Sequence, residues 1–201
     1  MRRLFFLLSL VFFLTDVSAI CPGVKAIDLG LPSGTKWANM NIGATKPEEF
    51  GGCFAWGETK EKSKYTWSNY IHCDGTEDAC HDIGNDISGT NYDVAHVKWG
   101  SGWKMPTREQ LIELIVCCEE EWTTVNGVEG YKLTSNINGN SIFFPAAHDG
   151  PFHNRFGAYW LSNQLEEDSR RACIFFFEEY DADSKSSSRY MGLSVRPVIY
   201  E

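Results

Sequence analysis

The chain has 201 residues, of which 18 are lysine or arginine and 27 are aspartate or glutamate, and 43% of the residues are hydrophobic. This composition is typical of a compact globular protein and excludes the disordered and collagen-like classes. The net charge of -9 and the lack of a basic run argue against a nucleic-acid partner, because nucleic-acid binding depends on clustered cations that displace counterions from phosphates.

The first 19 residues have the pattern of a signal peptide. Two arginines precede an apolar run of 11 residues at positions 4–14, and residues 17–19 are small enough for signal peptidase. A bilayer span takes about 20 residues, so this run is too short for a transmembrane helix, and no other stretch is long enough. The sequence predicts cleavage after Ala19 and no transmembrane segment in the mature chain.

Cleavage would leave one acidic domain at residues 20–201, either secreted or displayed at the cell surface. Cys21 offers an alternative location, a lipid anchor, because a bacterial lipobox ends in cysteine. Ile20 argues against lipidation, since the lipobox has a small residue at that position.

The N-terminal part of the domain predicts a hairpin followed by a long irregular segment. Residues 26–29 and 36–41 are rich in alternating, β-branched or aromatic residues, and the turn signal Leu-Pro-Ser-Gly at 31–34 separates them. From residue 47 to residue 81 the glycines and tryptophans follow no sustained period. Irregular segments of this length usually have a function of their own.

Two helices are predicted next. The first spans residues 91–99, where apolar residues repeat with helical spacing. The second spans residues 107–121 and has stronger signals, because Pro106 and Thr107 are typical of a helix start. Its apolar face, which we expect to pack on a sheet, is made up of Leu111, Leu114, Ile115 and Cys118.

The second half of the chain predicts strands separated by polar connections. The strands are expected at 130–134, 141–145, 158–162, 172–178 and 191–199. Asn138-Gly139 is a strong hairpin signal. We expect the polar segments 147–157, 163–171 and 179–190 to form one exposed face. Together the elements predict the α+β class, with a mixed, mainly antiparallel sheet, two helices and long loops.

All seven cysteines lie beyond the predicted cleavage site, where an oxidising compartment allows disulfides. Segment 72–81 contains two cysteines and two histidines, which could in principle bind zinc, but their spacing matches no common zinc module. The sequence therefore favours a disulfide between Cys73 and Cys80. Cys118 and Cys173 are the other disulfide candidates. Five carboxylates at 74–86 leave calcium as an open alternative, although the usual calcium-loop pattern is missing.

Several sequence strings occur in order over nearly the whole mature chain. They are IDLGLPSGTKWA at 27–38, FAWGET at 54–59, YTWSNY at 65–70, ISGT at 87–90, WKMPT at 103–107, FPAA at 144–147, GAYW at 157–160 and SVRPV at 194–198. These strings resemble the major paralogous domain family named from Fibrobacter succinogenes. The resemblance implies an exported bacterial surface protein with a C-type lectin-like fold, which is shared with sulfatase-modifying enzymes and with the variable proteins of diversity-generating retroelements. The chain departs from relatives at Ser162, which Leu161 and Asn163 flank where relatives usually show Ser-Ser.

No catalytic residue, cofactor or metal ligand is predicted. The sequence lacks the G-x-S-x-G and H-E-x-x-H motifs, and its five histidines have no catalytic spacing. The sulfatase-modifying enzymes rely on a late pair of cysteines, whereas this chain has only Cys173 there. An enzyme of that type remains an alternative, as does a structural surface protein without a ligand.

The leading hypothesis is a non-catalytic module that recognises a glycan or a protein through the three polar segments. Aromatic rings stack on the apolar faces of ligands, and arginine offers a fork to carboxylates. The candidate ligand-binding residues are His148, Asp149, Phe152, His153, Arg155, Tyr159, Arg189 and Tyr190. Most tryptophans are expected in the core instead, namely Trp37, Trp56, Trp99, Trp103 and Trp160.

Overall fold

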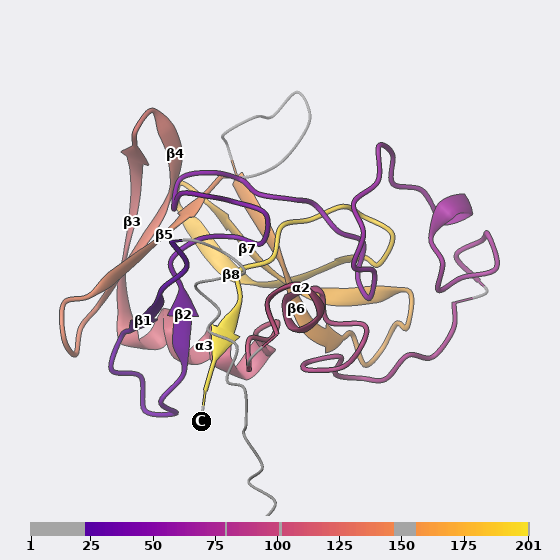
Figure 1. Cartoon of the computed structure of the whole chain (residues 1–201), viewed down its shortest axis with the longest axis horizontal. Coiled ribbons are helices and arrows are strands. Elements are labelled where there is room, and N and C mark those ends of the chain that lie inside the picture. Colours follow the sequence, from indigo (N-terminus) through magenta and orange to yellow (C-terminus); the bar gives the residue numbers. More distant parts are fainter. Residues whose placement is uncertain (1–22, 79, 101, 147–155, 201) are drawn as a thin grey trace, which may run out of the picture.

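The computed structural model describes residues 23–78, 80–100, 102–146 and 156–200. In these residues the chain forms three antiparallel sheets of three strands each and two α-helices, as Figure 1 shows. The predicted α+β class, with mainly antiparallel sheets and two helices, is thus confirmed. The predicted signal peptide, Cys21 and the candidate ligand residues between 148 and 155 lie outside the described residues.

The first sheet joins the two ends of the domain. Strand β1 (Ala26–Asp28) pairs with β2 (Lys36–Ala38), and β2 pairs with β9 (Val198–Ile199). The predicted N-terminal hairpin is therefore confirmed. The strand predicted at 191–199 is wrong in extent, because only its last residues form a ladder. Pro197 has no N–H to donate to a neighbouring strand, so the ladder stops there.

The second sheet is a meander of β3 (Cys118–Val125), β4 (Val128–Ser135) and β5 (Ser141–Pro145). Asn126 and Gly127 connect β3 to β4 with φ values of 49° and 85°, which is the conformation that a two-residue hairpin turn requires. Strand β3 corrects the sequence prediction, which extended the helix to residue 121. Three consecutive glutamates favour a helix locally, but eight cross-strand pairs with β4 determine the observed structure.

The third sheet consists of β6 (Phe156–Gln164), β7 (Arg171–Glu178) and β8 (Asp181–Ser188). Strand β8 is a second correction, because residues 179–190 were predicted to be a polar loop. Its serines, aspartates and lysine disfavour strands intrinsically. Eight consecutive pairs with β7 nevertheless hold them in a hairpin that turns through Glu179 and Tyr180.

Each α-helix begins at a side-chain cap. Asp93 accepts hydrogen bonds from the backbone N–H groups of Ala95 and His96 at the start of α2 (Val94–Trp99). Thr107 and Gln110 form a capping box at the start of α3 (Arg108–Cys117). Helix α3 contacts β3 and all three strands of the third sheet, and it buries Leu111 and Leu114 completely.

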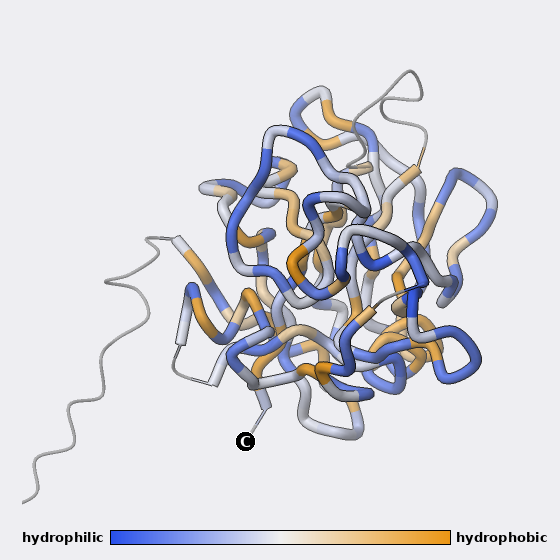
Figure 2. Tube along the Cα trace, turned by 90° about the vertical axis from the view of Figure 1, so that its right-hand side faces the viewer, coloured by the Kyte–Doolittle hydropathy of each residue, from blue (hydrophilic) through white to orange (hydrophobic). Residues whose placement is uncertain are grey.

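Two hydrophobic clusters lie on opposite faces of β7. Cys173, Phe175 and Phe177 point into one cluster, and Ala172 and Ile174 point into the other. Both clusters are rich in aromatic rings, and Figure 2 shows that many of the outer connections are hydrophilic. The five tryptophans predicted to be in the core are all buried, with exposed fractions of 4% or less.

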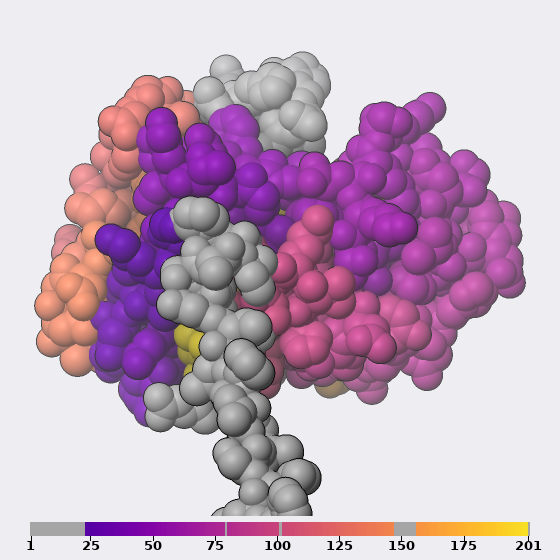
Figure 3. Space-filling model, in the orientation of Figure 1, coloured from indigo at the N-terminus to yellow at the C-terminus, as the bar shows by residue number. Residues whose placement is uncertain are grey.

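The segment between β2 and α2 is irregular, as predicted, and contains one 3-10 helix, η1 (Trp67–Asn69). Figure 3 shows that much of this segment forms a lobe, drawn in purple, beside the rest of the domain. A third, small cluster with Ala55, Tyr70 and Cys73 fills its interior. The lobe is therefore packed although it has little regular structure.

Candidate functional site

A hollow of about 410 Å³ lies where the third sheet meets the start of α3. Its lining consists of residues 85–86, 108–109, 163–167, 173 and 184–186. Two of the three segments predicted to form a binding face, 163–171 and 179–190, therefore meet here. The third segment, 147–157, lies mainly outside the described residues.

The end of β6 sets the position of α3 at the rim of this hollow. The amide of Ser162 donates to the carbonyl of Pro106 at 2.9 Å, and the side-chain oxygen of Asn163 accepts from the amide of Arg108 at 2.7 Å. The Arg108 side chain then reaches β8, where Nε donates to Oγ of Ser184 at 3.2 Å. Three elements far apart in sequence are thus linked around one opening.

The turn between β6 and β7 forms another wall. The amide of Gln164 donates to the carbonyl of Asn85 at 2.8 Å, which joins the turn to the segment before α2. Arg170 forks onto the carboxylate of Asp168 with distances of 2.8 and 2.9 Å, and these hydrogen bonds lower the pKa of Asp168. Local hydrogen bonds therefore give a definite shape to the segment that the sequence predicts only as a polar connection.

The lining contains more carboxylates than cations. Its carboxylates belong to Asp86, Glu109, Glu166 and Glu167, and its cations to Arg108 and Lys185. Lys185 is already engaged, since Nζ lies 2.6 Å from the carboxylate of Asp181 and 4.2 Å from the ring centroid of Phe176. The hollow thus presents an excess of negative charge, together with the side-chain amides of Asn163 and Gln164.

Cys173 contributes a thiol to the lining but is only 5% exposed. Burial raises its pKa, the carboxylates of Glu109, Glu167 and Glu166 act in the same direction, and Arg108 opposes them. The thiol therefore stays protonated at neutral pH, whereas a nucleophilic cysteine needs a lowered pKa.

The predicted involvement of Cys118 and Cys173 in disulfides is not observed, because both are free thiols. Cys118 starts β3 opposite Ser135, whereas Cys173 lies on β7 opposite Ser186. The two cysteines belong to different sheets, and burial raises the pKa of Cys118 to about 11. Helical spacing alone did not reveal that residue 118 begins a strand.

Two of the predicted ligand residues are buried. Tyr159 is 2% exposed, and its hydroxyl donates to the carbonyl of Pro145 at 2.6 Å. Arg189 is 0% exposed and its side chain points into the lobe. Burial removes both side chains from any ligand-contacting surface and gives them structural roles. Tyr190 is half-buried, with its ring 4.8 Å from that of Trp67.

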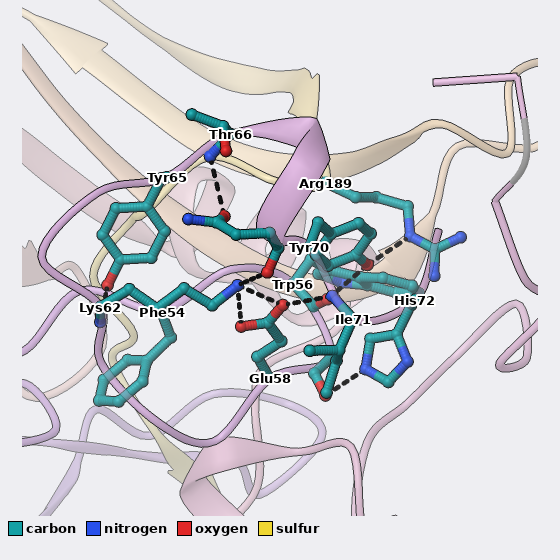
Figure 4. Close-up of polar contacts among 12 residues, drawn as sticks. Phe54, Trp56, Glu58, Lys62, Tyr65, Thr66, Tyr70, Ile71, His72 and Arg189 are labelled. Atoms are coloured by element: carbon teal, nitrogen blue, oxygen red, sulfur yellow. Dashed lines mark hydrogen bonds and ion pairs between the residues drawn. The ribbon is translucent and has the colours of Figure 1, made fainter. Parts of the chain in front are cut away.

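Figure 4 shows how Arg189 is held. Its Nε donates to the hydroxyl of Tyr70 at 2.9 Å, and its guanidinium carbon lies 4.7 Å from the ring centroid of Trp56. In the same view, Lys62 is paired with Glu58, whose carboxylate also accepts from the amide of Ile71 at 2.9 Å. The Arg189 contacts hold the lobe against the end of β8, whereas those of Glu58 lie within the lobe.

The predicted disulfide between Cys73 and Cys80 is present. It leaves neither sulfur as a thiolate for zinc. The neighbouring histidines are engaged elsewhere, since His72 bonds to the carbonyl of Gly57 at 2.9 Å and His81 to Asp74 at 2.9 Å. No group of three or more metal-ligating side chains occurs among the residues that the structure describes.

None of the described helices is long and apolar enough to cross a membrane. No protein-family model, curated protein or solved structure matches the chain. The resemblance noted above therefore rests on the sequence strings alone.

Sequence reasoning found part of the lining but not its structure. Ser184, Lys185 and Ser186 lie in the predicted binding segment 179–190 but were expected in a loop rather than a strand, and Arg108 and Glu109 were expected in a helix but not at a site. The hairpin that forms β8 turns through Glu179 and Tyr180, which carry no strong turn signal. No local signal brings Asn85 and Asp86 to the same place.

Proposed function

We propose that the chain is a non-catalytic recognition module that binds a glycan or a protein ligand in the hollow. The observation that supports this proposal is a preformed polar hollow of about 410 Å³, built from strand ends and a helix start. This volume falls in the usual range for small-ligand sites. Groups held on regular elements are also better preorganised than groups on free loops.

The chemistry of the lining suits a sugar unit best. Each sugar hydroxyl both donates and accepts, so it can donate to the carboxylates of Glu109 and Glu167 while it accepts from the amide of Asn163 or Gln164. Carboxylates and amides around one opening offer both kinds of partner. A protein ligand would have to present several hydroxyl or basic side chains to the same groups.

We also assign the domain to the C-type lectin-like fold, as an exported surface protein. The sequence strings and the predicted signal peptide support this assignment, and the antiparallel sheets with two helices are compatible with it. An experimental structure of the mature domain tests it by comparison with proteins of that fold.

A non-catalytic role is supported by the state of Cys173. An enzyme of the sulfatase-modifying type needs a reactive thiol, whereas burial and nearby carboxylates raise the pKa of this one. We therefore expect no thiol-dependent oxidation of cysteine-containing peptides by the purified protein. Mass spectrometry of such peptides after incubation with the protein measures their oxidation. An oxidised peptide would favour an enzyme of the sulfatase-modifying type.

A glycan array tests the proposal when it is combined with a substitution that fills the hollow. In Ser184→Tyr the added ring occupies space beside Arg108, so we expect a loss of affinity of about tenfold or more for any bound glycan. Thr124→Tyr is the matched control, because Thr124 is exposed on β3, away from the hollow. Equal binding by Ser184→Tyr and the unmodified protein would contradict the proposed site.

A further inference from the structure

A buried arginine that does not itself line the hollow is hydrogen-bonded to one of its walls. Arg189 is fully buried at the end of β8, and its Nη1 lies within hydrogen-bond distance of three oxygens from two separate segments. Two of these oxygens belong to the turn that forms the wall of the hollow. They are Oε1 of Gln164, at 3.3 Å, and the carbonyl of Ser169, at 2.9 Å.

The third oxygen belongs to the disulfide loop. The carbonyl of His81 lies 3.2 Å from Nη1 of Arg189, and the amide of His81 donates to the carbonyl of His72 at 2.7 Å. Between these two histidines, the disulfide joins Cys73 to Cys80. The disulfide therefore fixes the place from which His81 reaches the guanidinium.

Within the described residues, the hydrogen-bond acceptors of the Arg189 side chain are all neutral. A buried cation is costly unless its surroundings compensate for lost hydration. Here compensation comes from the carbonyls, from the hydroxyl of Tyr70 and from the ring of Trp56, while Nη2 has no hydrogen-bond partner within the described part of the chain. Because the cation already lacks one partner, the loss of another should move it and the groups it holds.

We propose that Arg189 is the positioning residue of the hollow and transmits the state of the Cys73–Cys80 disulfide to the turn at 163–171. A dithiol reductant supplies two electrons and two protons, becomes a disulfide itself and leaves two thiols on the chain. The freed loop no longer holds His81 against Arg189, so Gln164 and the turn lose their support. The effect on ligand affinity rests on the function proposed above, whereas the effect on the turn does not.

Hydrogen–deuterium exchange in the ligand-free protein tests the coupling. Replacing both cysteines (Cys73→Ser with Cys80→Ser) should speed amide exchange in the turn at 163–171 about fivefold or more, while the β3–β4 hairpin stays unchanged. Arg189→Lys keeps the charge but loses the planar fork, so it should produce the same increase. The single change Cys117→Ser is the matched control and should leave the turn unaffected.

A variant that combines Arg189→Lys with the two cysteine replacements distinguishes an effect transmitted through Arg189 from a general loss of stability. In the Arg189→Lys background, removal of the disulfide should add no further exchange at the turn. Unchanged exchange in the double serine variant, or additive effects in the combined variant, would overturn the proposal. Unchanged exchange in the β3–β4 hairpin shows that each variant is still folded.

Binding gives the second readout. For a glycan found on the array, the double serine variant should bind about fivefold more weakly than the unmodified protein. If exchange at the turn is faster in the double serine variant but no glycan is found to bind in the hollow, the coupling is supported and the proposed function is contradicted. If exchange at the turn is unchanged in the double serine variant, and the protein binds a glycan that Ser184→Tyr does not bind, the function is supported and the coupling is contradicted.

Discussion

Two arginines of the described residues are buried with neutral hydrogen-bond partners, and each joins different elements. Arg189 joins the lobe to the turn of the hollow. Arg196 is 1% exposed and donates to the carbonyls of Ala38 and Phe143 at 3.1 and 2.9 Å. It also donates to the side-chain oxygen of Asn41 at 2.8 Å, and burial lowers its pKa to about 10. Arg196 therefore joins the first sheet to β5.

Replacing Arg196 should be strongly destabilising. In Arg196→Met the carbonyls of Ala38 and Phe143 lose their donor inside the core, so we expect the free energy of unfolding to fall by about 3 kcal/mol or more. Urea denaturation measures the change. Arg171→Met, at a half-buried position, serves as the control. A loss below about 1 kcal/mol at Arg196 would show that these hydrogen bonds contribute little.

His72 gives the fold a dependence on pH. Its imidazole bonds to the carbonyl of Gly57, and burial, together with Arg189 and His81, lowers its pKa, while the hydrogen bond and Glu58 oppose this shift. Because the pKa is lower in the folded state than in the unfolded state, the unfolded chain takes up a proton first as the pH falls. Stability should therefore decrease as the pH falls below about 6.5 and level off below the folded pKa.

Two substitutions isolate this contribution. His72→Gln keeps a donor for the carbonyl of Gly57 but cannot titrate, so the decrease in stability between pH 7 and pH 5 should be smaller than in the unmodified protein. Thr124→Gln, at an exposed position on β3 that does not titrate, should leave the slope unchanged. Thermal unfolding at a series of pH values provides the comparison, and an equal slope in His72→Gln would contradict the assignment.

At the scale of elements, strong local signals located the N-terminal hairpin, the start of α3 and the turn at Asn138-Gly139. Two strands were missed because long-range pairing outweighs local preference. Strand β3 contains Glu119–Glu121, which favour a helix, and β8 consists largely of serine and charged residues. Each strand gains eight pairs with its neighbour, and such pairs cannot be read from a local window.

The candidate site was predictable only in part, for the same reason. The turn at 163–171 was expected to contribute from its polar composition. The contribution of β8 depends on its pairing with β7, and that of residues 85–86 depends on an isolated bridge between Asp86 and Asn163. Burial of Tyr159 and Arg189 could not be foreseen, because both residue types also occur at binding surfaces.

The capping box stabilises the start of α3, which lies at the rim of the hollow. Thr107→Ala removes the acceptor for the amide of Gln110, and we expect a loss of about 1 kcal/mol in the free energy of unfolding. Thr124→Ala, on the exposed face of β3, should change it by less than about 0.5 kcal/mol. Urea denaturation of both variants checks the prediction, and equal stability would contradict the role of the cap.

At the scale of the whole molecule, the two hydrophobic clusters on either side of β7 fix the third sheet, and α3 covers one of its faces. The lobe drawn in purple in Figure 3 is attached through Arg189 to the same sheet. The hollow at 163–167 and 184–186 is thus connected through Arg189 to the lobe that contains the Cys73–Cys80 disulfide.

Mapping of ligand contacts by NMR tests the central claim most directly. The glycan that gives the strongest array signal is titrated into the ¹⁵N-labelled protein. Chemical-shift changes should concentrate on the amides of 163–167, 184–186 and the start of α3, and the recovered glycan should be chemically unaltered. Changes centred on the β3–β4 hairpin, or a modified glycan after incubation, would contradict recognition in the hollow without catalysis.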